Sequence, residues 1–353
     1  MSNALEKLKA LARTVAAPLN GRDARIWAET GLPVLRGGSP DPVAEALKAD
    51  MQPLLARGDF TALAAAFDTA FAEKAFTPRG YRTYRAAHEL LMAPIEDAAY
   101  DAEAMAEVLP VYERWWLAER GDPAAAAMYA TALAMAGLSQ CGDGTAETVS
   151  DEGLRDLVAF THQARSVLNH AGARGRAHWL WRKADMFIAF AECSADVDET
   201  DTLLPAFAAV QTLDPLEFGV YDDRTLQLLP RWFGSFGQLE VFAKAAADRT
   251  AAQFGDLLYA RIYDCVLMHE DVEDTHMDAG RLMRGFADWM QRFPSQPLAN
   301  RAAAHAHVLG DTGALDELFR QHISEIHVET WFDDKQPLQA WREVSRSDRR
   351  ARG

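Results

Sequence analysis

Apolar residues recur three and four positions apart along most of the chain, which is the spacing of one buried face of an α-helix. Clear examples are Phe60, Leu63 and Phe67 in the first half and Leu282 and Phe286 in the second. The strict alternation of apolar and polar residues that is typical of a half-buried strand is not sustained anywhere. The pattern therefore predicts an all-α fold.

Glycine–aspartate pairs mark many of the junctions between these periodic stretches. They begin at Gly58, Gly121, Gly142, Gly255 and Gly310. Glycine tolerates the left-handed conformation that ends a helix, and the aspartate side chain can cap the helix that follows. Paired helices joined by short turns predict a degenerate tetratricopeptide-like α-solenoid of helical hairpins, with an irregular repeat length.

The best-punctuated stretch of the chain is residues 213–263, which predicts three helices separated by two short turns. Asp214 precedes a proline, and Glu217 follows three positions after Asp214, which is a capping-box arrangement for a helix expected to run to about residue 229. Ser235 and Gln238 predict a second capping box. A glycine and an aspartate then separate the second helix from the third.

The same stretch resembles an uncharacterised family of bacterial helical-repeat proteins. Weaker similarity extends over residues 54–331, which is most of the chain. The resemblance implies a tetratricopeptide-like fold and no activity, because the family has no catalytic motif to carry over. The residues that carry it are Leu228, Pro230, Arg231, Trp232, Gly234, Ser235, Phe242, Ala243, Ala246, Ala247, Gly255, Tyr259, Ala260, Arg261, Ile262 and Tyr263.

The distribution of glycine, proline and charge predicts three segments. Residues 1–40 form an N-terminal segment and connector, residues 41–334 form the helical-repeat domain, and residues 335–353 form a polar tail. We expect the basic end of this tail, residues 345–353, to be disordered. A loop at residues 140–150 offers a point of subdivision within the repeat domain. One helix is expected to start near Pro78, to carry His88 on its apolar face and to be broken at Pro94.

Composition and charge exclude several classes of protein. The net charge of −16 and the pI near 5.1 disfavour nucleic-acid binding, which depends on neutralising phosphates with Lys and Arg. Cys141, Cys193 and Cys265 are scattered and odd in number, which indicates reduced thiols in a bacterial cytoplasm. No apolar run approaches the roughly 20 residues of a membrane span. We expect a cytoplasmic protein with neither a membrane nor a nucleic-acid partner.

Candidate chemistry is sparse. Residues 269–278 contain His269, His276 and several carboxylates, which could bind a transition metal. The seven-residue spacing of the two histidines does not match the H-E-x-x-H motif, and a solvated acidic connector explains the segment equally well. Nucleophile and nucleotide-loop motifs are lacking, so we predict no catalytic residues and no cofactor.

An aromatic and arginine set remains as the candidate binding surface, because Trp, Tyr and Arg dominate interface hot spots. Adjacent or nearly adjacent tryptophans on one helix cannot face the same core, although two intramolecular surfaces would also accommodate them. The first hypothesis is a non-enzymatic protein-binding adaptor, scaffold or immunity-type inhibitor, with a basic partner in the last case. The alternative is an enzyme or small-molecule sensor with a pocket inside the superhelix, metal-assisted through His269 and His276. The predicted binding residues are Trp115, Trp116, Trp179, Trp181, Arg182, Arg231, Trp232, Tyr259 and Arg261.

Overall fold

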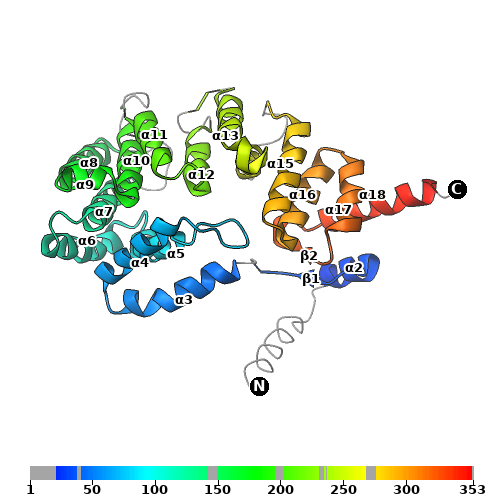
Figure 1. Cartoon of the computed structure of the whole chain (residues 1–353), viewed down its shortest axis with the longest axis horizontal. Coiled ribbons are helices and arrows are strands. Elements are labelled where there is room, and N and C mark those ends of the chain that lie inside the picture. Colours follow the sequence, from blue (N-terminus) through cyan, green and yellow to red (C-terminus); the bar gives the residue numbers. More distant parts are fainter. Residues whose placement is uncertain are drawn as a thin grey trace, which may run out of the picture. The chain divides into compact units, whose positions relative to one another are not determined.

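The computed structural model is all-α, with two very short strands among the residues it describes (Figure 1). Those residues are 21–37, 41–141, 149–194, 202–229, 234–235, 237–267 and 276–351, the last five without their side chains. Contacts between residues divide the chain into two compact units. We call Asp41–Phe236 the central unit, and Met1–Pro40 together with Gly237–Gly353 the terminal unit.

In the central unit many helices pack on a neighbour in the sequence, and some also pack on a helix two or three elements away. Helix α7 is its core element, since it packs against α6, α8 and α10, and these four lie side by side at the left of Figure 1. The helices are α3 (Pro42–Ala56), α4 (Phe60–Glu73), α5 (Arg85–Asp97), α6 (Ala102–Ala118), α7 (Pro123–Cys141), α8 (Asp151–Asn169), α9 (Gly172–Arg176), α10 (Trp179–Ser194), α11 (Leu203–Leu213) and α12 (Phe218–Gln227).

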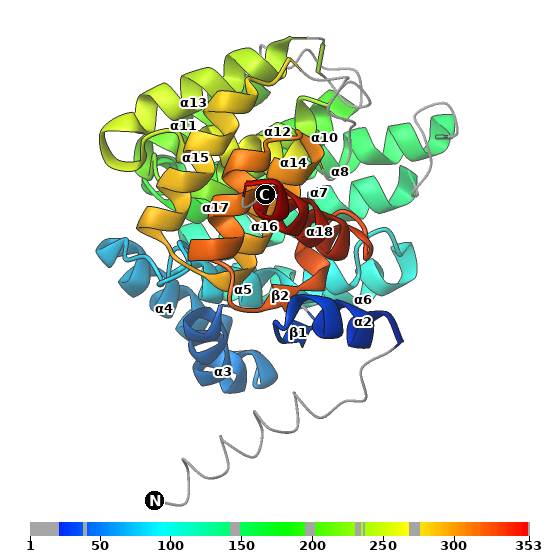
Figure 2. The same ribbon diagram turned by 90° about the vertical axis from the view of Figure 1, so that its right-hand side faces the viewer.

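The terminal unit combines the two ends of the chain. Strand β1 pairs in parallel with β2, with Val34 opposite Ile326, α2 packs on β1, and α18 packs on α2 (Figure 2). Its elements are α2 (Gly21–Thr30), β1 (Val34–Leu35), α13 (Gln238–Phe254), α14 (Leu257–Val266), α15 (Ala279–Arg292), α16 (Gln296–Val308), α17 (Thr312–Gln321), β2 (Ile326–His327), the 3₁₀ helix η3 (Val328–Thr330) and α18 (Gln336–Ala351).

Most of the predicted aspartate and serine caps form. Asp59 accepts a hydrogen bond from the amide of Ala62, and Asp122 and Ser150 cap α7 and α8 in the same way. Such a cap needs only residues within one turn, so its sequence pattern is sufficient to specify it. The periodic apolar positions also behave as predicted, because Phe60, Leu63 and Phe67 are buried on one face of α4.

Four predicted helix boundaries are wrong. The helix expected from Pro78 begins at Arg85, because residues 76–82 form a turn closed by a bridge between Phe76 and Arg82, and Pro94 lies inside this helix rather than ending it. Helix α12 begins at Phe218 and is capped by Glu217, since the carboxylate of Asp214 binds elsewhere. Helix α13 follows Gly237, which has a φ of 88° and contributes no side-chain cap, so the Ser235 capping box does not form.

The end of the chain that we expected to be disordered is helical as far as residue 351. Residues 336–351 form α18, on which Leu338 and Val344 are buried, and the indole of Trp341 donates a hydrogen bond to the backbone oxygen of Glu29 at 3.0 Å. The expectation that the chain has no strands also fails for β1 and β2, whose two-residue length is too short to give an alternating pattern. The possible subdivision near residues 140–150 is not where the two units divide.

Helix α7 is long and apolar enough to cross a membrane by length and composition, and no other described helix meets that test. However, 83% of its apolar window is buried inside the unit. Its alanines allow α6, α8 and α10 to approach closely, and the burial of the helix on every side accounts for its uniform hydrophobicity.

Candidate functional site

A cavity of about 480 Å³ lies within the central unit, between α5, α7, α10 and α12. Apolar side chains form most of its wall, and methionine is unusually frequent among them. Methionine is flexible and polarisable, so such a wall can adapt to irregular apolar ligands. The volume falls within the range of small-molecule sites in proteins. The main apolar lining residues are Met92, Met128, Met135, Leu180, Met186, Phe187, Phe190 and Leu226.

Polar side chains enter the same cavity from three helices. Helix α5 contributes Arg85, His88, Glu89 and Glu96, which fall on one face because they are spaced three, four and eleven residues from the first. Helix α10 contributes Lys183, about one helical turn after Trp179. Helix α12 contributes Asp223 and Gln227, and Glu217 at its N-cap. The site therefore combines an adaptable apolar wall with convergent polar groups, as ligand sites do.

Among the groups that line the cavity, His88 has the most strongly shifted pKa. Its ring meets the indole of Trp179 edge to face, with 5.3 Å between the ring centroids. Burial lowers the pKa of His88 to about 3, and the positive charges of Lys183 and Arg85 lower the pKa further in the same direction. The imidazole is therefore neutral at pH 7 and can both donate and accept a hydrogen bond.

The cavity contains two cations, Arg85 and Lys183, and each lies near a carboxylate. Arg85 lies 3.6 Å from an oxygen of Glu89 and 3.8 Å from an oxygen of Glu217, both beyond normal hydrogen-bond length. The ammonium of Lys183 contacts the carboxylate of Asp223, whose side chain is 41% exposed. Burial lowers the pKa of Lys183 to about 8, with the Glu217 carboxylate acting in the opposite direction. The Asp223 oxygen in this contact is itself buried, although the side chain as a whole is partly exposed.

Besides the Asp223 oxygen that contacts Lys183, two buried polar atoms of lining residues have no hydrogen-bond partner within the described part of the chain. They are the indole N–H of Trp179, a residue that is 2% exposed, and the amide oxygen of Gln227, which is 7% exposed. Leaving such a group unpaired costs about 1–3 kcal/mol, so unpaired polar atoms in a core require an explanation. Both residues line the cavity, although these two atoms are not themselves exposed to its space.

The neutral state of His88 predicts a specific dependence of stability on pH. The folded pKa of about 3 lies below the ordinary value of about 6.5, so the unfolded chain binds a proton first as the pH falls. The stabilisation is complete above pH 6.5 and is lost toward pH 3. We expect His88 alone to lower the free energy of unfolding by about 1–2 kcal/mol between pH 8 and pH 5.

Urea unfolding at pH 8, 6 and 5 measures this contribution. His88→Gln removes the titrating group, and its stability should fall less on acidification than that of the wild type. The exposed His162, on α8 of the same unit, supplies the control, and His162→Gln should retain the wild-type slope. An unchanged slope in His88→Gln would show that the imidazole is not held neutral by its surroundings.

The structure places the predicted aromatic and arginine set in several separate locations. Trp115 stacks on Phe60, and Trp116 packs against Tyr129, so each tryptophan of the pair faces a different intramolecular surface. Trp181 donates a hydrogen bond to the backbone oxygen of Leu168, on the opposite side of α10 from the Trp179 contacts. The two-surface explanation therefore accounts for both pairs.

Only Trp179 of that set lines the cavity. Arg182 lies over the ring of Trp181, Arg261 lies over Trp289, and Tyr259 is fully buried in the terminal unit. Arg231 and Trp232 lie outside the described residues. The role of these residues in holding a partner stays a prediction.

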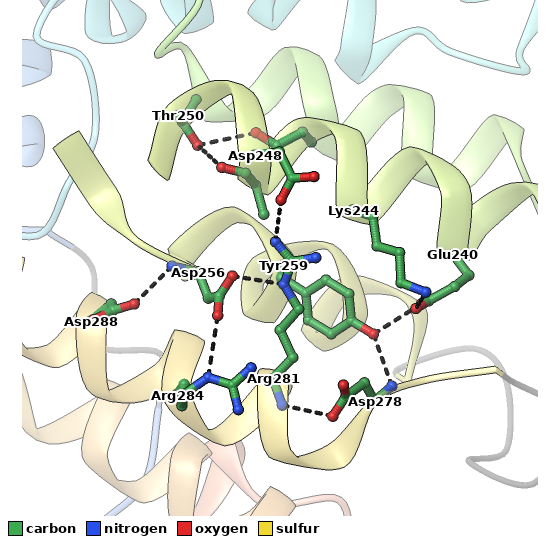
Figure 3. Close-up of polar contacts among 12 residues, drawn as sticks. Glu240, Lys244, Asp248, Thr250, Asp256, Tyr259, Asp278, Arg281, Arg284 and Asp288 are labelled. Carbon is green, nitrogen blue, oxygen red and sulfur yellow. Dashed lines mark hydrogen bonds and ion pairs between the residues drawn. The ribbon is translucent and has the colours of Figure 1, made fainter. Parts of the chain in front are cut away.

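The densest polar network of the terminal unit joins α13, α14 and α15 (Figure 3). Glu240 accepts hydrogen bonds from the hydroxyls of Tyr259 and Tyr263, and Tyr259 in turn accepts one from the amide of Asp278 at 2.8 Å. Arg281 bridges Asp256 and Asp248 at 2.7 and 2.6 Å. Burial raises the pKa of both tyrosines, so they remain protonated donors. Because these groups bind one another, the network holds three helices together rather than presenting groups to a ligand.

Sequence reasoning missed the cavity residues apart from Trp179. Arg85, His88 and Glu89 share a face with Met92, and this polar end of an otherwise apolar stripe is the signal that could have indicated them. No group of three or more His, Cys, Asp or Glu side chains among the described residues could hold an ion, but most of residues 269–278, including His269, lies outside them, so the metal hypothesis stays a prediction.

Comparisons with family models, curated proteins and solved structures gave no match to this chain. The resemblance to a bacterial helical-repeat family therefore stays a prediction, and the functional argument depends on the geometry of the cavity.

Proposed function

We propose that the central unit binds a small molecule with a large apolar part in the cavity between α5, α7, α10 and α12. The observation that carries this proposal is the cavity of about 480 Å³, whose methionine-rich wall is met by polar side chains from three helices. This function is the sensor form of the second hypothesis, without a metal. We assign no chemical step to this cavity.

A neutral apolar fluorophore such as N-phenyl-1-naphthylamine tests the proposal. We expect saturable binding of one probe per chain. Ala184 lines the cavity on α10 and is 2% exposed, so Ala184→Phe should fill the space and weaken probe binding at least tenfold. The matched control is Ala208→Phe, at an exposed position of α11 in the same unit. Absence of saturable binding, or equal binding by both variants, would contradict the proposal.

We further propose that the helices of the central unit form a tetratricopeptide-like array. The pairing of α6 with α7, of α7 with α8 and of α10 with α11 supports this arrangement, because neighbours in the sequence are neighbours in space. An array of this kind should show graded hydrogen-exchange protection from helix to helix. A single protection value throughout the central unit would contradict it.

A protein partner in the bacterial cytoplasm is the second candidate. The net charge of −16 supports a basic partner, since complementary charge accelerates and orients association. Trp115, Trp179, Trp181 and Tyr259 are buried within the chain, so the acidic net charge is the main support for a protein partner. A partner captured from the native host at low salt and released by about 0.5 M salt would support it, because salt screens such contacts; retention at high salt would count against the electrostatic basis.

A further inference from the structure

The cavity lining carries both signs of charge at close quarters. Arg85 and Lys183 supply positive charge, and the carboxyl groups of Glu89, Glu96, Glu217 and Asp223 supply negative charge. Each cation faces a carboxylate, but the Arg85–Glu217 separation of 3.8 Å leaves the guanidinium donors free to bind another acceptor. The ammonium of Lys183 has three donors, of which the Asp223 contact uses one.

Helix α12 sets the spacing of these groups. A Cβ at Gly219 would lie 3.0 Å from a guanidinium nitrogen of Arg85, so Arg85 lies against the first turn of α12. Asp223, which contacts Lys183, is four residues further, and Gln227 is four beyond that. Successive groups therefore lie about 6 Å apart along the helix axis. The two cations are close enough for one carboxylate to lie between them, with Gln227 one turn further on.

This arrangement selects among ligand head groups. A singly charged anion would meet the carboxylates of Glu217 and Asp223, and a singly charged cation would meet Arg85 and Lys183. An uncharged head group would displace water from the charged side chains without forming ion pairs with them, and this desolvation costs free energy. A head group that carries both charges can pair with both sets, and like-charge contacts are then avoided.

We propose that the ligand of this cavity is a zwitterion of the α-amino acid type with a bulky apolar side chain. This inference rests on the proposed small-molecule binding by the central unit. The ligand carboxylate lies between Arg85 and Lys183, and the ammonium pairs with the carboxylates of Glu217 and Asp223. The apolar side chain extends along the methionine and phenylalanine wall. A ligand long enough to reach the next turn can donate a hydrogen bond to Gln227.

Three probes with the same aromatic tail separate the charge requirements. L-phenylalanine carries both charges, 3-phenylpropionate only the carboxylate and 2-phenylethylamine only the ammonium. Isothermal titration calorimetry at pH 7 should give a Kd for phenylalanine at least tenfold lower than that of either analogue. An analogue that binds as tightly as phenylalanine would overturn the inference.

Two variants assign the charges to their partners. Lys183→Met keeps the aliphatic stem without the ammonium, and it should weaken phenylalanine binding about tenfold while leaving phenylethylamine binding equal or tighter. Asp223→Asn should weaken phenylethylamine binding and leave phenylpropionate binding equal or tighter. The exposed Lys335, in the terminal unit, provides the control Lys335→Met, which should change neither. Equal effects of Lys183→Met on all three probes would contradict the assignment.

The fluorophore separates the failure of this inference from the failure of the proposed function. If the fluorophore binds saturably and Ala184→Phe prevents its binding, but phenylalanine neither binds nor displaces it, the cavity is a ligand site and the zwitterion class is wrong. If the fluorophore also fails to bind, both proposals fall.

Discussion

Replacing Asp214 by alanine is expected to lower the free energy of unfolding of the central unit by about 3–5 kcal/mol, because it leaves a buried guanidinium without its counter-charge. The side chain of Arg82 is 5% exposed and that of Asp214 is 1% exposed, and they are joined at 2.7 Å. Asp214 also accepts a hydrogen bond from the hydroxyl of Tyr84 at 3.0 Å. Denaturant unfolding of the variant measures the loss.

Glu45→Ala is a matched control in the same unit. Glu45 forms an ion pair with Lys48 at 2.6 Å, but its side chain is 49% exposed, so its loss should cost less than about 1 kcal/mol. The double variant Arg82→Met/Asp214→Leu should recover much of the stability, because it removes both buried charges together. An Asp214→Ala variant no less stable than Glu45→Ala would show that the buried pair contributes little.

The Arg82–Asp214 pair also positions the candidate site. Arg82 and Tyr84 immediately precede α5, which carries Arg85 and His88, while Asp214 immediately precedes the Glu217 cap of α12. The pair therefore joins the beginnings of two of the four helices that line the cavity. We expect Asp214→Ala to weaken binding of the apolar fluorophore even at temperatures where the unit remains folded.

Asp214 also illustrates which parts of the fold the sequence can specify. Its local pattern is the same as that of a capping box, yet its carboxylate binds Arg82, a residue 132 positions earlier. Asp59 and Ser150 have no such competing partner, and both cap their helices as predicted. Local hydrogen bonds can thus be predicted from local sequence, whereas a long-range partner that takes the same group cannot.

The candidate site depends even more on long-range packing. Helical spacing identifies the polar end of the α5 stripe and the apolar face of α10, but it does not tell which faces oppose each other. The cavity forms because residues from Arg85 to Gln227 meet across four helices. The same limit applies to α18. Its polar sequence is typical of a disordered tail, but Leu338 and Val344 are buried against other parts of the chain, which the local sequence does not reveal.

Asn300 is the residue of the terminal unit whose loss should cost most. It is fully buried, and its amide donates to the backbone oxygens of Gln296 and Glu325 at 2.9 Å each. Its side-chain oxygen accepts from the amide of His327 and the indole of Trp331 at 3.1 Å each. The side chain thereby makes all four hydrogen bonds of which it is capable.

Asn300→Ala is expected to lower the free energy of unfolding by about 3–5 kcal/mol. The substitution leaves two donors and an acceptor buried without partners, and each such group costs about 1–3 kcal/mol before the surrounding structure relaxes. The exposed Gln339 on α18 supplies the control, and Gln339→Ala should change stability by less than about 0.5 kcal/mol. Equal losses in the two variants would show that solvent or rearrangement satisfies the exposed groups.

Hydrogen exchange can locate the effect of Asn300→Ala, because Asn300 fixes the segment that carries β2. The amide of Ile326 donates to the backbone oxygen of Pro33 at 2.7 Å, which attaches β1 to β2. Loss of the Asn300 contacts should therefore expose this amide first, and α2 should follow because it packs beside β1. The helices of the central unit should keep their protection. Uniform loss of protection across both units would mean that the chain unfolds as one cooperative structure, and not as the two units into which its contacts divide it.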